Sequence, residues 1–352
     1  MYTPAYYISQ ANFQRREIFQ WNRNGYRNCD FRIKRNSWFE NRALLLLSIS
    51  NARNFAMALD LTIESIEDVL NEPQYAEFSI PKKSGNKRII LKPGPELMYI
   101  QNRLNHLLQC YYYLIRPKEA HGFVLSPDKN EMPIGIVSNA LPHVGKRTVL
   151  NIDLHNFFSP ISAKQIKQLF LSDTFSFNDN IASTMALLCT YKGKLPTCTP
   201  TSPVLSNFIC LPLDKALQSF CVEQDLTYTR YADDMTFSTM RKIGIDTVLD
   251  LIGIIRDHGF RINEKKLRMK GKGRRQVVTG LTVNEKVNPS KEMRKKVRAM
   301  RHDLETNGLE SASKQHFKMS TRPSQELQEK FLNKLWGYES FLKQVREGKK
   351  SS

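Results

Sequence analysis

The chain has no long hydrophobic run, no cysteine pattern typical of a metal site and comparatively little negative charge. Its strongest apolar stretch, residues 43–49, is interrupted by Ser48 and is far too short to cross a bilayer. The six cysteines include no CxxC pair and no zinc-ligand spacing, which favours buried thiols in a reducing compartment. The N-terminus lacks a basic region followed by an apolar one, so we predict no signal peptide, no membrane partner and a cytoplasmic location.

Positive charge is what the chain has in excess. Lys and Arg number 53 against 34 Asp and Glu, for a formal net charge of +19 over 352 residues. With 41% hydrophobic residues, the sequence is long and apolar enough to form two or three subdomains around a sizeable core. So large an excess favours a polyanionic partner, nucleic acid before a membrane surface. Charge alone predicts only binding to a phosphate backbone, which a structural RNA-binding protein would also show.

Two adjacent acids, Asp233 and Asp234, stand between two runs of β-branched and aromatic residues, 228–231 and 235–238. This pattern predicts a tight hairpin with the acids at its tip. Adjacent carboxylates repel each other, so such a pair often exists to hold a divalent cation. A lone Asp-Asp pair is nevertheless most often an exposed turn, so the interpretation depends on partner groups elsewhere in the chain.

Asp153 supplies a third carboxylate. It ends an apolar strand predicted over residues 148–153, and the aromatic pair Phe157 and Phe158 follows. A strand-end acid beside a double-acid hairpin suits two Mg²⁺ ions, with Mn²⁺ as a substitute, that clamp an in-line phosphoryl displacement. The main-chain carbonyl of Leu154 is a further candidate metal ligand.

Hydrophobic spacing and turn residues predict the remaining elements. A hairpin is expected over residues 77–80 and 87–91, with a basic, glycine-containing tip at 82–86. Helices are predicted over residues 44–59, 62–70, 96–115, 163–170, 179–191, 203–220, a stretch ending at 257, 292–304 and the region of Phe331 to Phe341. Thr62 is the predicted N-cap of the second of these helices. A short strand is predicted over residues 260–262. Helices interspersed with hairpins predict an α+β fold.

At this point the chain resembles the reverse transcriptases, and within them the bacterial retron type, over about residues 62–300. The resemblance rests on the segments 151–154 with Phe157-Phe158, 201–207, and Tyr231-Ala232-Asp233-Asp234. The stretches 139–143 (NAxxH) and 278–280 (VTG) look retron-specific. The resemblance implies a right-hand polymerase: an N-terminal extension over residues 1–60, fingers over 61–150, a palm with an antiparallel sheet over 151–285, and a helical thumb and RNA-binding region over 286–352.

The resemblance also implies roles for individual residues. Asp153, Asp233 and Asp234 would be catalytic and, with Leu154, would hold the metal. Nucleotide-binding roles would fall on Lys82, Lys83, Arg88, Phe158, Thr197 and Lys266, with Phe158 as the steric gate that excludes a ribose 2′-hydroxyl. RNA-binding roles would fall on His121, Asn139, His143, Thr279, Arg294, Lys295, Lys296 and Arg298.

Simpler interpretations remain open for several of these residues. Phe158 is equally typical of a core aromatic, the lysines of the 82–86 tip of a solvated surface, and His143 of a hydrogen-bonded turn. Thr279 and Gly280 are also typical of a backbone requirement. One departure stands out: relatives usually carry Pro-Gln-Gly where this chain has Pro196-Thr197-Cys198.

The function that the resemblance implies is RNA-directed DNA synthesis from dNTPs. A cognate structured non-coding RNA would be copied into multicopy single-stranded DNA from a guanosine 2′-hydroxyl, and a host RNase H would remove the template. An effector or toxin protein encoded nearby would complete an anti-phage defence system. The alternatives are another bacterial reverse transcriptase, of the abortive-infection, diversity-generating or intron type, and a catalytically silent RNA-binding scaffold that restrains a toxin, which Thr197 and Cys198 motivate.

Overall fold

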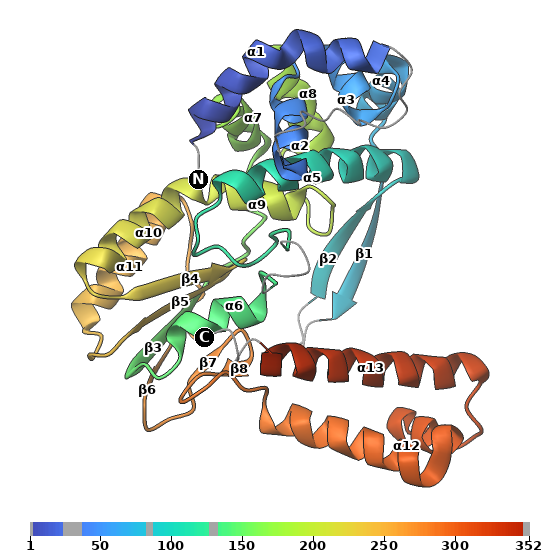
Figure 1. The fold of residues 1–352 in the computed structure, drawn as a ribbon, viewed down its shortest axis with the longest axis vertical. Helices are drawn as coiled ribbons and strands as arrows, with labels where there is room; N and C mark the ends of the chain where they lie inside the picture. Colours follow the sequence, from blue (N-terminus) through green and yellow to red (C-terminus); the bar gives the residue numbers. More distant parts are fainter. Residues whose placement is uncertain (1–2, 24–36, 82–86, 127–132, 348–352) are drawn as a thin grey trace.

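The computed structural model of the protein describes residues 3–23, 37–81, 87–126 and 133–347, and combines helices with an antiparallel sheet (Figure 1). The first part contains α1 (Pro4–Arg23), α2 (Trp38–Leu47), α3 (Ala52–Leu59), α4 (Ile63–Asn71), β1 (Tyr75–Pro81), β2 (Lys87–Pro93) and α5 (Pro95–Ile115). The middle part contains α6 (Ile136–Ala140), η1 (Leu141–His143), β3 (Thr148–Asp153), α7 (Ala163–Leu171), α8 (Asp179–Cys189), α9 (Ser202–Ile209), α10 (Leu211–Glu223), β4 (Thr227–Tyr231), β5 (Asp234–Thr239) and α11 (Ile245–Asp257). The last part contains η2 (Glu264–Lys266), β6 (Arg268–Gly271), β7 (Val277–Val278), β8 (Leu281–Thr282), α12 (Lys291–Phe317) and α13 (Gln325–Glu347).

The central sheet has the strand order β4-β5-β3-β6 and is antiparallel throughout. Because side chains alternate along a strand, β3 serves two cores. Leu150 and Ile152 pack with residues of α10 and α11, whereas Val149 packs with residues of α6 and of the β7–β8 hairpin. The sheet is therefore covered by α10 and α11 on one face and by α6 and the β7–β8 hairpin on the other.

The largest core fills the N-terminal helical lobe. The long helix α5 lies across this lobe and packs against α2, α3, α4, α8 and α9 (Figure 1). It ends before Pro117, as predicted, and Thr62 caps α4 with its side chain, as predicted. The β1–β2 hairpin also forms in the predicted place, although its tip at residues 82–86 lies outside the described residues.

Three predicted elements are wrong in detail. The helix expected over residues 44–59 is two helices, because the chain breaks after Leu47 and Asn51 caps α3. The helix expected over residues 203–220 breaks at Cys210, where Pro212 begins a new helix instead of continuing the old one. The strand expected over residues 260–262 is reduced to a single bridge between Ile262 and Leu154.

The last two helices, α12 and α13, pack on each other around a small core that includes Val297, Met300, Phe331 and Leu335. Figure 1 shows this pair below the β1–β2 hairpin. Among the cysteines that the structure describes, four are buried and Cys198 is exposed, which confirms the expectation of mostly buried thiols. None of the helices in the described residues is long and apolar enough to cross a membrane.

Candidate active site

The strand register brings the three predicted acids to one end of the sheet. Asp153 is the last residue of β3 and lies opposite Asp234, the first residue of β5. The backbone N–H of Leu154 donates to the carbonyl of Asp233 over 2.9 Å. The carboxylates that are far apart in sequence therefore meet because β3 and β5 are adjacent and antiparallel.

The turn that carries the acid pair is strained. Tyr231 pairs with Asp234, so Ala232 and Asp233 form a two-residue connection between β4 and β5. Ala232 has φ +57°, a left-handed conformation that residues with a Cβ seldom adopt. Such a conformation persists only where the surrounding structure holds it in place.

A buried arginine provides much of that support. Arg230 is 0% exposed and forms two hydrogen bonds with the carboxylate of Asp214, Nε to Oδ1 at 2.7 Å and Nη2 to Oδ2 at 2.6 Å. Its Nη1 donates to Oδ1 of Asn207 at 2.9 Å and to the carbonyl of Ala232 at 3.2 Å. The hydroxyl of Tyr228 also donates to Asp214, over 2.8 Å. Arg230 thus links α9 and α10 directly to the strained turn.

A close backbone approach supports the turn from the other side. The segment before Gly122 runs beside β4, with the N–H of His121 donating to the carbonyl of Arg230 at 2.8 Å. A Cβ added at Gly122 would lie 2.3 Å from the backbone nitrogen of Ala232, so only glycine fits there. Nδ2 of Asn207 donates to the carbonyl of Gly122 over 2.9 Å and closes the network.

Our sequence interpretation gave no role to Arg230, Asp214 or Gly122. A signal was present, because an arginine within a strand of β-branched and aromatic residues has to find a partner where that strand is buried. That partner, Asp214, comes from α10, and nothing in the sequence pattern identifies it.

The electrostatics of the acids suit a divalent cation. Burial, together with the charges of Asp153 and Asp233, raises the pKa of Asp234 to about 7. Lys266 opposes this effect, since its ammonium lies 3.0 and 2.8 Å from the two carboxylate oxygens of Asp153. Asn263 donates to the same carboxylate over 3.3 Å.

Within the described ranges, no group of three His, Cys, Asp or Glu side chains is placed so that it could hold a metal ion. Mg²⁺ does not require one, because it is usually bound by one or two carboxylates together with substrate phosphates and water. The mutual repulsion that raises the pKa of Asp234 beside Asp153 is what such an ion would relieve.

The two aromatic residues after Asp153 differ in their surroundings. Phe157 is 4% exposed and stacks on Phe260 with ring centroids 6.0 Å apart, so it belongs to the core. Phe158 is half-buried and packs at the border of the two largest cores. Only Phe158 therefore keeps surface that a nucleotide can contact.

The unusual loop at residues 196–198 contacts the hairpin strand. The hydroxyl of Thr197 donates to the carbonyl of Ile89 in β2 over 2.9 Å. Cys198 has φ +69°, and it stands where the resembling family has glycine. The chain therefore keeps a glycine-like backbone at this position in spite of the Cβ of Cys198.

The predicted nucleotide-binding residues of the hairpin are described only in part. Lys82 and Lys83 lie outside the described residues, and Arg88 lies opposite Ile80 in the β1–β2 ladder.

Two residues predicted to bind RNA are inside the protein. His143 and Asn139 are both 0% exposed, so neither contacts RNA in this conformation, and that expectation is corrected. The ring of His143 is hydrogen-bonded to the hydroxyls of Ser238 at 2.7 Å and Thr229 at 2.8 Å. Burial lowers the pKa of His143 to about 3. Its role in the structure is to tie β4 to β5.

His121 and Thr279 also make internal contacts. The ring of His121 is hydrogen-bonded to Ser138 over 2.9 Å, and burial lowers its pKa to about 4. Thr279 and Gly280 have φ +45° and +81° and connect β7 to β8, which is the pattern of a type I′ turn. The simpler interpretation of Thr279 and Gly280, that the turn requires their backbone conformation, is therefore supported by the structure.

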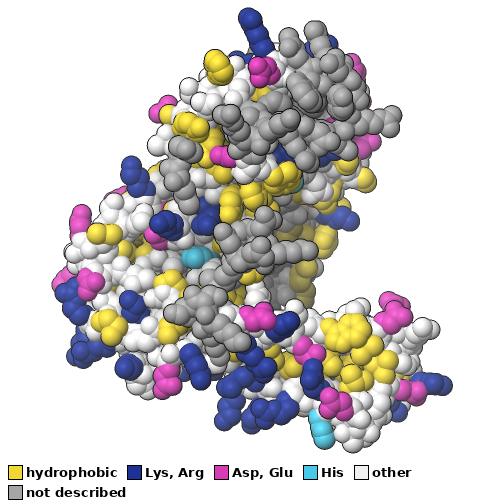
Figure 2. Space-filling model, in the orientation of Figure 1, with side chains coloured by type: hydrophobic (Ala, Val, Ile, Leu, Met, Phe, Trp, Pro, Cys, Tyr) yellow, Lys and Arg dark blue, Asp and Glu magenta, His cyan; other side chains and the backbone are white. Residues whose placement is uncertain are grey.

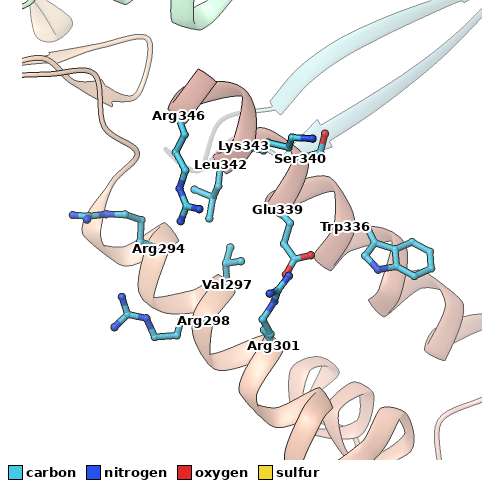
Figure 3. Close-up of a pocket in the computed structure, with 10 residues that line it drawn as sticks. All are labelled: Arg294, Val297, Arg298, Arg301, Trp336, Glu339, Ser340, Leu342, Lys343 and Arg346. Atoms are coloured by element: carbon cyan, nitrogen blue, oxygen red, sulfur yellow. The ribbon is translucent and has the colours of Figure 1, made fainter. Parts of the chain in front are cut away.

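The predicted basic residues of α12 lie on an exposed surface. Arg294 and Arg298 line a groove of about 690 Å³ between α12 and α13 (Figure 3). The groove is also lined by three residues of α13, Trp336, Lys343 and Arg346. Lys295 and Lys296 are exposed nearby, and Figure 2 shows Lys and Arg side chains gathered near the start of α12.

Comparisons with known sequences agree with this geometry. The sequence profile of the family described as "Reverse transcriptase (RNA-dependent DNA polymerase)" matches residues 80–283. The chain is 34% identical to the Retron Mx65 reverse transcriptase of Myxococcus xanthus over 247 residues, which cover 65% of this chain and 55% of that protein. It is 32% identical to the Retron Ec86 reverse transcriptase of Escherichia coli over 273 residues, which cover 76% of this chain and 82% of that protein.

The chain was also compared with solved structures, and one match is an apo telomerase from Candida tropicalis. It matches 61% of this chain and 55% of its own, with 12% sequence identity and a TM-score of 0.45.

Proposed function

The chain belongs to the reverse transcriptases, and within them to the retron type, and from this premise we propose that it copies a cognate structured non-coding RNA into multicopy single-stranded DNA. The observation that supports this proposal most strongly is the meeting of Asp153, Asp233 and Asp234 at one end of the sheet. This arrangement suits nucleotidyl transfer, in which a hydroxyl attacks the α-phosphate of a dNTP.

In the proposed reaction, Asp153, Asp233 and the main-chain carbonyl of Leu154 would hold Mg²⁺, with Asp234 adjacent. Mg²⁺ held there would supply positive charge beside the attacking hydroxyl and the phosphates. The Arg230 network holds the turn that carries Asp233 before substrate arrives. Lys266 pairs with Asp153 in the structure, and its ammonium would leave that carboxylate for the triphosphate of the incoming nucleotide.

The other predicted nucleotide contacts complete this proposal. Phe158 excludes a ribose 2′-hydroxyl, and Thr197 fixes the loop against β2. Arg88, with Lys82 and Lys83 at the hairpin tip, neutralises the triphosphate. Cations beside a triphosphate stabilise charge that develops during the transfer.

The basic surface of α12 and α13 is the proposed binding surface for the RNA. Arg294, Lys295, Lys296 and Arg298 would contact its phosphates, and Trp336, with 57% of its surface exposed, offers a face for stacking. Retron membership further suggests priming from a guanosine 2′-hydroxyl, removal of the template by a host RNase H in the cytoplasm, and an effector encoded nearby in an anti-phage defence system.

The first test replaces the acid pair by Asp233→Asn and Asp234→Asn. The nucleic acid that copurifies with wild type and variant is separated on a gel before and after RNase treatment. We expect a discrete DNA in the wild type that shifts to a shorter species with RNase, and no DNA in the variant. DNA of undiminished yield in the variant would refute the catalytic assignment.

The same experiment separates the alternatives. A heterogeneous DNA would favour an abortive-infection, diversity-generating or intron-type enzyme. A wild type without DNA that still binds RNA and restrains a toxin partner would favour the silent scaffold, for which the strained Cys198 is the structural motive.

A further inference from the structure

A third aromatic residue packs at the candidate sugar gate, and it comes from a distant part of the chain. Phe123 follows Gly122 in the loop after α5, and its ring centroid lies 6.2 Å from that of Phe158 at an interplanar angle of 41°. Both side chains are half-buried. The separation falls in the range over which aromatic rings attract each other. The ring of Phe158 therefore has two aromatic neighbours, Phe123 and Phe157, and its centroid lies 5.2 Å from that of Phe157.

The backbone of Phe123 is held in an unfavourable conformation. Its φ is +56°, which a large side chain rarely adopts. The carbonyl of Phe123 accepts hydrogen bonds from Nε2 of Gln109 at 3.1 Å and Nδ2 of Asn207 at 3.4 Å. Strain that several contacts maintain is common at functional positions. The same Asn207 bonds Arg230, so the ring is placed by the network that holds the acids.

We propose that Phe123 is a positioning residue for substrate specificity: it holds the ring of Phe158 in the place from which Phe158 excludes ribonucleotides. This inference rests on the proposed function, in which Phe158 is the gate. Phe157 does not suffice for this task, since its ring is committed to the core and to Phe260. Without the ring of Phe123, Phe158 gains space on its loop-facing side and moves aside when a ribose enters.

The test measures kcat/KM for a ribonucleotide and for the matching deoxynucleotide on one primer–template. It compares Phe123→Ala, Phe123→Leu, Phe158→Ala and the double variant Phe123→Ala with Phe158→Ala. We expect Phe158→Ala to lose the most discrimination, and Phe123→Ala to lose roughly three- to tenfold, as the loss of an aromatic pair predicts. The double variant should equal Phe158→Ala alone, because Phe123 acts through Phe158.

Phe260→Leu is the matched control. It removes a ring that stacks on Phe157, one ring further from the gate, and should lower thermal stability without changing the ratio of ribonucleotide to deoxynucleotide use. A ratio that changes equally in this control would show that loss of core packing, and not the position of Phe158, explains the result.

The outcomes are distinguishable. Unchanged discrimination in both Phe123 variants, or an additive effect in the double variant, overturns the inference. The specificity role is also wrong if both Phe123 variants fold, as their melting temperatures report, but no longer use deoxynucleotides. Unchanged discrimination in Phe158→Ala refutes the gate itself, and a folded wild type that makes no DNA refutes the proposed function.

Discussion

The end of the sheet that carries the acids and the α12–α13 pair are built in opposite ways. At the sheet, Arg230 and Asp214 are 0% and 1% exposed, and the hydrogen bonds of Arg230 go to other buried groups. On α12, Arg294, Lys295 and Arg298 are exposed. One region uses charge to fix geometry, and the other exposes charge on the surface.

The two regions should therefore differ in how strongly a substitution affects them. A buried ion pair that loses one partner leaves a charge without compensation, so one substitution disturbs the whole region. Exposed charges act through a screened field and contribute separately, so each one matters little. We therefore expect large effects from substitutions at the sheet and small effects from those on α12.

Arg230→Met should have the largest effect. It leaves Asp214 buried without its cation, and we expect the free energy of unfolding to fall by about 3–5 kcal/mol. Arg241→Met, which breaks the exposed pair with Asp225 at 3.1 Å, should cost less than about 1 kcal/mol. Urea denaturation followed by circular dichroism measures both. Equal losses would remove the distinction between the two regions.

A double variant sharpens this result. Arg230→Met with Asp214→Leu replaces the buried pair by apolar groups and should recover most of the lost stability. It should not recover DNA synthesis, because the turn still lacks the hydrogen bond to the carbonyl of Ala232. Recovery of both would mean that Arg230 serves stability alone.

Gly122→Ala should affect activity more than stability. The new Cβ displaces the Ala232 turn, and a displacement of about 1 Å costs roughly 100-fold in rate. Gly253→Ala is the control, since Gly253 is in α11 with open space around it and should become slightly more stable. Primer extension by both variants tests the prediction, and a fully active Gly122→Ala enzyme would contradict it.

The two histidines behind the acid turn should make stability depend on pH. His143 and His121 have pKa values of about 3 and about 4 in the folded protein, lowered by burial, against an ordinary value of about 6.5. Below pH 6.5 these two histidines therefore bind more protons in the unfolded chain than in the folded protein, so the stability that they contribute falls as pH falls. Asp234, with its pKa raised to about 7, contributes with the opposite sign over the same range. In this pH range each histidine changes the free energy of unfolding by at most about 1.4 kcal/mol per pH unit.

Urea denaturation at several pH values between about 7 and 4 checks this prediction. His143→Gln should flatten the dependence, whereas His302→Gln, at an exposed position in α12, should leave the slope unchanged. An unaltered slope in the His143 variant would mean that this ring does not remain neutral in the folded protein.

The substitutions on α12 should have the smallest effect per residue. Replacing Arg294, Lys295 and Lys296 together by Ala should weaken RNA binding and reduce the slope of log affinity against log salt by roughly 0.7 to 0.9 for each phosphate that the protein no longer neutralises. A control that removes the same charge elsewhere, Lys164, Lys215 and Lys242 to Ala, should keep the slope. An unchanged slope in the first variant would place the RNA elsewhere.

Local patterns allowed most helices and strands to be predicted, and their failures have local causes as well. Pro212 starts a helix instead of continuing one, and the side chain of Asn51 begins α3 where apolar spacing suggested a continuous helix. Hydrophobic spacing reports which residues face a core, but it does not locate the position where a helix is interrupted.

By itself, the sequence determined the strand that ends at Asp153 and the two-residue turn that carries Asp233, because strand propensity and turn formation are local properties. The meeting of the three acids depends on the pairing of β3 with β5, which are distant in sequence. Only the tertiary structure decided how the turn is held. Arg230 depends on Asp214, Asn207 and the backbone near Gly122, which come from other elements. Tertiary burial also moved His143 from a candidate RNA contact to a buried link between β4 and β5. Burial and hydrogen-bond partners depend on residues distant in sequence, and local patterns carry no record of them.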